Sequence, residues 1–127
     1  MKKIIYTKNA PDAIGTYNQA IETKSMIFTS GQIGIDPNTG ELISTKIKDQ
    51  IQQTLKNIDA ILVGAGLSKD SIVKLTVYLK DFNDFHVINN AFKLFFNDYE
   101  FPARSTVEVS ELPMGACVEI DCIATKE

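Results

Sequence analysis

Apolar residues recur at helical spacing through 45–63. They are separated by three or four positions, which places them along one stripe of a helix: Ile47, Ile51, Leu55, Ile58 and Leu62. Ser44 or Thr45 can cap the start of this helix, and Gly66 in the following "GAG" is expected to end it in a left-handed conformation.

A second helix is predicted before Pro102. Its apolar stripe is Phe85, Ile88, Phe92 and Phe95. Asp81 or Asn83 can cap its start, and it ends near Tyr99 because Pro102 cannot continue a helix.

Alternating patterns predict three strands between and after the helices. In 71–81 one face should carry Val73, Leu75, Val77 and Leu79. In 101–109 one face is small and apolar enough to be buried, with Ala103, Ser105, Val107 and Val109, and the opposite face carries Arg104, Thr106 and Glu108. In 116–125 one face carries Val118, Ile120, Cys122 and Ala124, and the other carries Glu119, Asp121 and Ile123.

The segment 26–36 opens as a further strand, but Gly31 and Gly34 break its alternation. Glycines inside a strand indicate a bulge or the close approach of another backbone or a ligand. The following "DPNTG", 36–40, is a turn sequence, and "ELI" is expected to return as a short hairpin strand.

The order of elements is strand, hairpin, helix, strand, helix, strand, strand, which predicts a single α+β domain over 1–127. Both helices should cover the same face of a mixed sheet. The other face would then expose its apolar positions in a monomer, so self-association is expected.

Composition narrows the class of protein. The 127 residues carry a formal net charge of -3 with no basic run, which argues against a nucleic-acid partner. The sequence has no apolar stretch long enough to span a membrane and no convincing signal peptide, so a cytoplasmic protein with no membrane partner is expected.

Cysteine and histidine content further limits the chemistry. Cys117 and Cys122 are separated by an odd number of strand positions and should point to opposite faces, so they are interpreted as structural thiols rather than a disulfide. The single histidine, His86, argues against a metal site.

Arg104 is the strongest candidate for a ligand-binding residue. A guanidinium offers a planar fork that matches a carboxylate through two hydrogen bonds. The commoner alternatives are an ion pair with Glu119 or Glu108 and a solvated surface side chain.

The other candidates are individually unspecific. Glu119 could be an exposed strand residue or, if partly buried, a general base. Ser30 and Gly31 offer a hydroxyl and an open backbone N–H, or they form a tight turn or bulge. Tyr17 could line a pocket or simply pack, and Asn89 could be a solvent-facing amide.

Together these residues fall within stretches that resemble the RidA family, also called the YjgF/YER057c/UK114 family, nearly from end to end. The stretches are "NAPDAIGTYNQAI", "FTSGQIGIDPNTGEL", "NIDAILVGAGLSKDSIVKLTVYLKDFNDF", "FPARSTVEV" and "ELPMGACVEIDCIA". The resemblance implies a chorismate-mutase-like α+β domain that assembles as a homotrimer, with sites in clefts between subunits.

The activity implied by the resemblance is hydrolysis of reactive 2-imino acids to 2-keto acids and ammonia, without a metal, cofactor or covalent intermediate. Arg104 would hold the substrate carboxylate with help from the Gly31 N–H, and Glu119 would orient or activate water. Ser30, Tyr17 and Asn89 would line the site, with Thr106 at a position where many members have cysteine.

Two other functions stay open. A trimeric regulatory protein could bind a small carboxylate in the same cleft without turnover. An endoribonuclease or translation inhibitor is less well supported, because the sequence has a net negative charge and a single histidine.

Overall fold

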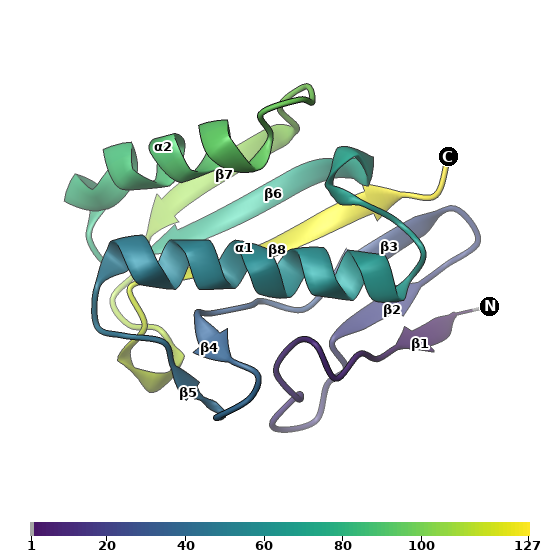
Figure 1. Ribbon diagram of the computed structural model, residues 1–127, viewed down its shortest axis with the longest axis horizontal. Coiled ribbons are helices and arrows are strands. Elements are labelled where there is room, and N and C mark those ends of the chain that lie inside the picture. Colours follow the sequence, from purple (N-terminus) through teal and green to yellow (C-terminus); the bar gives the residue numbers. More distant parts are fainter. Residues whose placement is uncertain (1) are drawn as a thin grey trace.

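Two helices lie across one face of a six-stranded sheet, as the sequence predicts (Figure 1). The computed structural model describes residues 2–127. The longer helix is α1 (Ile47–Gly64) and the shorter is α2 (Phe85–Phe95). No helix in this described part is long and apolar enough to cross a bilayer.

The large sheet has the order β1-β2-β3-β8-β6-β7. Only β6 and β7 run parallel, joined by α2, and all other neighbours are antiparallel. The strands are β1 (Lys3–Ile5), β2 (Ala20–Glu22), β3 (Met26–Thr29), β6 (Ile72–Leu79), β7 (Ala103–Glu108) and β8 (Val118–Thr125). The sequence analysis missed β1 and β2, because a strand of 3 residues is too short to show alternation.

A separate two-stranded sheet follows β3. It pairs β4 (Ile35–Asp36) with β5 (Glu41–Leu42) around the predicted turn, where the Gly40 N–H donates to the Asp36 carbonyl at 2.8 Å. The prediction of close approach at Gly34 is confirmed, because an added Cβ there would lie 2.8 Å from the Gln50 Cα of α1.

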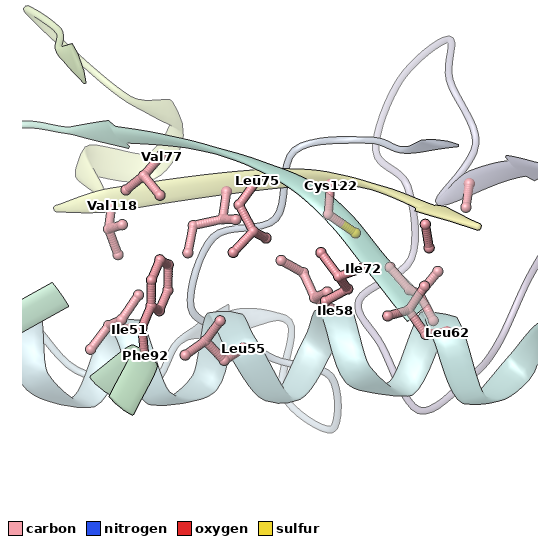
Figure 2. Packing of buried hydrophobic residues seen from close by; sticks show 14 of the residues in the cluster. Ile51, Leu55, Ile58, Leu62, Ile72, Leu75, Val77, Phe92, Val118 and Cys122 are labelled. Carbon is pink, nitrogen blue, oxygen red and sulfur yellow. The ribbon is translucent and has the colours of Figure 1, made fainter. Parts of the chain in front are cut away.

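The core fills the space between the sheet and the helices. Figure 2 shows Ile51, Leu55, Ile58 and Leu62 of α1 pointing toward side chains of β6 and β8, which confirms the predicted stripe and the predicted inward face of β8. From α2, Ile88 and Phe92 are buried.

The predicted end of α1 is confirmed, whereas α2 ends at Phe95, before the predicted end near Tyr99. Gly66 has φ +81, and the Leu67 N–H donates to the Leu62 carbonyl at 2.8 Å, as expected for a left-handed helix end. The N-cap of α1 is Lys46, with no side-chain cap bond. Instead of capping directly, Ser44 donates its hydroxyl to Asp49 at 2.8 Å.

A second cap was predicted at Asp81 or Asn83. Asp81 accepts from the Asn83 N–H at 2.9 Å, and this bond caps a short 3-10 turn (82–84) that leads into α2.

The prediction that Val73 shares a face with Leu75, Val77 and Leu79 is wrong. The register between β6 and β8 shifts between Ile72 and Lys74, so Ile72 is buried while Val73 is 41% exposed. This irregularity changes the face on which the strand's first residues lie, and the alternation holds from Leu75 onward.

The predicted burial of β7 is also wrong. Arg104 and Thr106 are in register with the buried Leu75 and Val77 of β6, so they lie on the helix-covered face. The apolar residues Ala103 and Val107 point to the opposite face and are exposed, as is Ser105; Val109 lies beyond the strand and is half-buried.

The face of the sheet opposite the helices is left uncovered by this chain, as expected. An apolar row crosses it in register, made of Ile4, Ile21, Phe28 and Ile123. Phe28 is 43% exposed and Ile4 is 60% exposed. We call this side of the sheet the open face.

Candidate active site

Arg104 lies beneath α2, at the edge of the sheet. Its guanidinium carbon is 5.3 Å from the centroid of the Phe85 ring and 5.2 Å from that of Phe92, within the range of cation–π contacts. Burial lowers the pKa of Arg104, but a guanidinium remains protonated at neutral pH.

Neither alternative raised for Arg104 describes its surroundings. Glu108 instead accepts from the Phe82 N–H at 2.8 Å. Among the residues described, the one ion pair joins Lys126 and Glu22, at 2.7 Å. Arg104 is therefore a half-buried cation without a carboxylate partner among residues 2–127.

A cavity of about 410 Å³ opens beside Arg104, within the size range of small-ligand sites. Its lining is mostly apolar with three polar side chains: Leu75, Asn89, Phe92, Lys93, Phe96, Phe101, Pro102 and Arg104. The combination of a cation, an amide and aromatic walls suits a small organic anion.

Asn89 and Thr106 belong with Arg104. Asn89 lines the cavity and is half-buried, so it is not a solvent-facing amide. Thr106 lies two positions along β7 on the same face, and its buried hydroxyl oxygen has no hydrogen-bond partner within the described chain. Such an oxygen remains available to a ligand or a water molecule.

Glu119 and Gly31 meet on the open face. An added Cβ at Gly31 would lie 2.5 Å from Oε2 of Glu119, so the carboxylate occupies the space that a side chain at residue 31 would need. Burial, followed by the negative charge of Asp121, raises the pKa of Glu119. A half-buried carboxylate with a raised pKa has the character of a general base.

Ser30 connects Gly31 to the loop that carries Tyr17. Its hydroxyl donates to the Asn18 carbonyl at 2.5 Å, and its N–H donates to the Gln19 carbonyl at 2.9 Å. Tyr17 is 49% exposed, and its hydroxyl accepts from the Ile14 N–H at 3.3 Å. The described chain therefore uses Ser30 to hold this loop beside Gly31.

Three buried amides fix the loops around the site, and the sequence analysis missed them. Gln19 donates to the carbonyls of Thr7 and Pro11, at 2.9 and 2.8 Å. Gln50 accepts from the Cys117 N–H at 2.7 Å, and Asn57 donates to two carbonyls of the 33–35 segment. A hydrophobic pattern contains no signal for such bonds, because it marks glutamine and asparagine only as polar.

The predicted residues therefore form two groups on opposite faces of the sheet. Arg104, Asn89 and Thr106 lie on the helix-covered side, where Arg104 is in register with Leu75. Glu119 is in register with Tyr78, which points the other way, and it lies beside Gly31 and Ser30. The chain does not bring Arg104 and Glu119 together within itself.

The remaining titratable groups agree with the structural interpretation of the thiols. Cys117 and Cys122 are both free, and burial raises the pKa of Cys122 to about 12. Within residues 2–127 no three histidine, cysteine or acidic side chains cluster as a metal site would require. A second cavity, of about 330 Å³, lies between the helices and contains none of the predicted site residues.

The sequence profile of the family described as "Endoribonuclease L-PSP" matches residues 7–126. The chain thus belongs to this family, which is the RidA/YjgF family. The resemblance inferred from the sequence motifs is confirmed.

Curated relatives align over nearly the whole chain. "Putative reactive intermediate deaminase TdcF" of Escherichia coli is 48% identical, covering 99% of this chain and 98% of the relative. The "2-iminobutanoate/2-iminopropanoate deaminase" of Salmonella typhimurium is 46% identical and covers 99% of both chains.

Solved structures confirm the fold. E. coli TdcF with bound serine superposes with a TM-score of 0.95 at 46% identity, covering 98% of this chain and 99% of TdcF. The conserved Rid-family protein YyfA of Yersinia pestis gives a TM-score of 0.96 at 50% identity, covering 98% of this chain and 99% of that one.

Proposed function

We propose that the chain is a 2-iminobutanoate/2-iminopropanoate deaminase, which hydrolyses reactive 2-imino acids to 2-keto acids and ammonia. The observation that carries the proposal is Arg104, a half-buried cation that has no carboxylate partner and lines a cavity. A cation held in this way suits the carboxylate that substrate and product share. The relatives named as deaminases at 46–48% identity support the same reaction.

The working site is assembled between copies of the chain in a homotrimer. Arg104 and Glu119 project from opposite faces, so one copy must supply the carboxylate anchor and a neighbour the base. The apolar row on the open face gives the copies a surface to bury against one another.

In this site Arg104 binds the carboxylate, with the Gly31 N–H as a further donor. The imine reacts in its protonated form: Glu119 takes a proton from water as the water oxygen bonds to the C=N carbon, and the C=N π electrons move to nitrogen to give a neutral amine. Glu119 then returns that proton to the amine nitrogen. The C–N bond breaks, ammonia leaves, and the carbinol oxygen forms the keto C=O as its proton passes to Glu119 and then to ammonia or solvent.

The other predicted residues have supporting roles. Asn89 and Thr106 offer polar contacts beside Arg104, and the unpartnered Thr106 hydroxyl is free to donate to the bound acid. Tyr17 covers the site from the loop that Ser30 holds. Two free thiols suit a reducing compartment, so we place the enzyme in the cytoplasm.

Two other functions make different predictions. An endoribonuclease needs a concentrated positive surface, and the chain carries 13 basic against 16 acidic residues. A regulatory protein that only binds a carboxylate needs the cation but not a half-buried base beside Gly31.

A coupled assay tests the proposal. Threonine dehydratase generates 2-iminobutanoate, and the appearance of 2-ketobutyrate is followed with and without the purified chain. Faster keto-acid formation in proportion to added protein is expected. Binding of 2-ketobutyrate without any acceleration would instead identify a regulatory binder.

A further inference from the structure

Asp121 is the carboxylate nearest along the strand to Glu119 on the open face. The two residues are separated by two positions on β8 and therefore share a face. Both are half-buried, although each is ionisable and like charges on one face repel. Placing two carboxylates side by side does not stabilise the strand, whether that face is solvated or buried.

Tyr78 lies next to both carboxylates. It lies opposite Glu119 in the β6–β8 register, and its hydroxyl donates to Oδ2 of Asp121 at 3.4 Å. The tyrosine hydroxyl therefore points toward Asp121, and among the described residues Glu119 has no hydrogen-bond partner. Asp121 thus has a long hydrogen bond to the described chain, whereas Glu119 remains available to a ligand.

The neighbouring strands contribute few other charges to this face. Among the described residues of the adjoining strands, the side chains on this face are Lys74, Thr76 and Tyr78 of β6, with Thr76 directly opposite Asp121, then Ser105 and Val107 of β7, and Phe28 of β3. Lys74 and the Tyr78 hydrogen bond favour the charged form of Asp121, although burial opposes it and is the larger effect, so the pKa of Asp121 is raised.

We propose that Asp121, held by the Tyr78 hydroxyl, is a positioning residue that tunes the exchange of a proton between Glu119 and the attacking water. The inference rests on the deaminase function proposed above. A negative charge beside Glu119 disfavours its carboxylate form, which makes Glu119 a stronger base toward water. Asp121 acts through Glu119 and does not touch the substrate.

The decisive measurement is the titration of Glu119 itself, followed by ¹³C NMR of protein labelled at the glutamate side-chain carboxyl. The Glu119 signal is assigned as the one that disappears in Glu119→Gln. Asp121→Asn should lower the midpoint of this titration by on the order of half a pH unit, because it removes a nearby like charge. Tyr78→Phe should move it in the same direction by less.

The acidic limb of kcat/KM should move with the titration. Asp121→Glu keeps the charge and should restore the wild-type limb, whereas Asp98→Asn removes an exposed carboxylate beyond α2 and should leave both readouts unchanged. Circular dichroism and light scattering on every variant establish that fold and assembly are intact.

The outcomes separate this inference from the proposed function. An unmoved or raised Glu119 midpoint in Asp121→Asn would overturn the inference, as would a moved midpoint with an unmoved acidic limb. Wild-type protein that releases no keto acid, but whose Glu119 midpoint moves in Asp121→Asn, would support the coupling and overturn the deaminase function.

Discussion

The side chains on the two faces of the sheet differ in how far the chain itself buries and pairs them. On the covered face the chain completes its own core, and the edge strand β7 carries two polar groups that have no partner among the described residues: Arg104 lacks a carboxylate, and the buried Thr106 hydroxyl oxygen lacks a hydrogen bond. On the open face an apolar row and two half-buried carboxylates face outward. In the proposed enzyme a ligand would complete the first face, and another copy of the chain would cover the second.

This difference explains why the candidate residues divide as they do. Arg104, the proposed carboxylate anchor, lies at the edge of the core, where burial strengthens a charge-assisted bond. Glu119, the proposed base, lies on the surface expected to be buried by assembly, and its pKa is already raised within one chain. Association of copies would create both the interface and the complete site.

Breaking the open face should have the largest effect. Wild-type protein is expected to contain about three chains per particle by light scattering. Phe28→Asp places a charge in the middle of the apolar row and should yield monomers that lose nearly all turnover. Leu94→Asp, at a residue 75% exposed on α2, is the matched control and should stay trimeric and active. A stable wild-type monomer with full activity would contradict both the assembly and the shared site.

Removing the anchor on the covered side should have the next largest effect. Arg104→Ala should weaken binding of 2-ketobutyrate by about 2–4 kcal/mol, because a desolvated carboxylate would lose its charge partner. Arg104→Lys keeps the charge but loses the fork, so it should also bind poorly. Calorimetry on the three proteins measures the effect, and light scattering should show an unchanged trimer. Equal affinities would show that Arg104 does not bind the ligand.

Neutralising the base on the open face should affect turnover more than binding. Glu119→Gln keeps the side-chain shape but removes its basicity, and should reduce kcat by about 10²-fold or more. The affinity for 2-ketobutyrate should change little, which distinguishes this variant from Arg104→Ala. Unchanged turnover would show that Glu119 is part of a polar strand face only.

The contact between Gly31 and Glu119 gives a finer test of the same face. Gly31→Ala adds a Cβ 2.5 Å from the present position of Oε2, and the flexible carboxylate can move away. The melting temperature should change little, but turnover should fall by about 10-fold or more because the base is displaced. A large loss of stability with normal activity per folded chain would mean that the contact is purely structural.

How far the sequence predicted these two faces depends on the length of each element. The helices and β8 are long enough to show their periods, so their buried sides were predicted correctly. On β7, alternation separated Arg104 from Ala103, but composition alone favoured burial of the apolar set. The register with Leu75 determines which face of β7 is covered, and the sequence of a single strand does not reveal its register with its neighbour.

The candidate site could be proposed from the sequence as a set of residues but not as an arrangement. The motifs identified Arg104, Glu119 and Gly31, and the structure places the last two in contact. The placement of Arg104 and Glu119 on opposite faces depends on the registers of β7 and β8 with β6, which no local pattern shows. The contact by which Ser30 fixes the Tyr17 loop depends on a hydrogen bond to the Asn18 carbonyl, 12 positions away in the sequence.

The smallest expected effect concerns Thr106, the polar group on the covered side that has no partner. Its buried hydroxyl oxygen makes no hydrogen bond within the described chain, and an unsatisfied buried polar group lowers stability. Thr106→Val keeps the shape and removes this group, so it should raise the free energy of unfolding by about 1 kcal/mol in thermal denaturation.

If the Thr106 hydroxyl only assists Arg104, Thr106→Val and Thr106→Ala should both retain substantial deaminase activity. Alkylation of the thiols under native conditions should also leave that activity largely intact. Complete loss of turnover in a folded, trimeric Thr106→Ala variant would instead require a mechanism in which Thr106 reacts directly, and the covered side would then hold more than the carboxylate anchor.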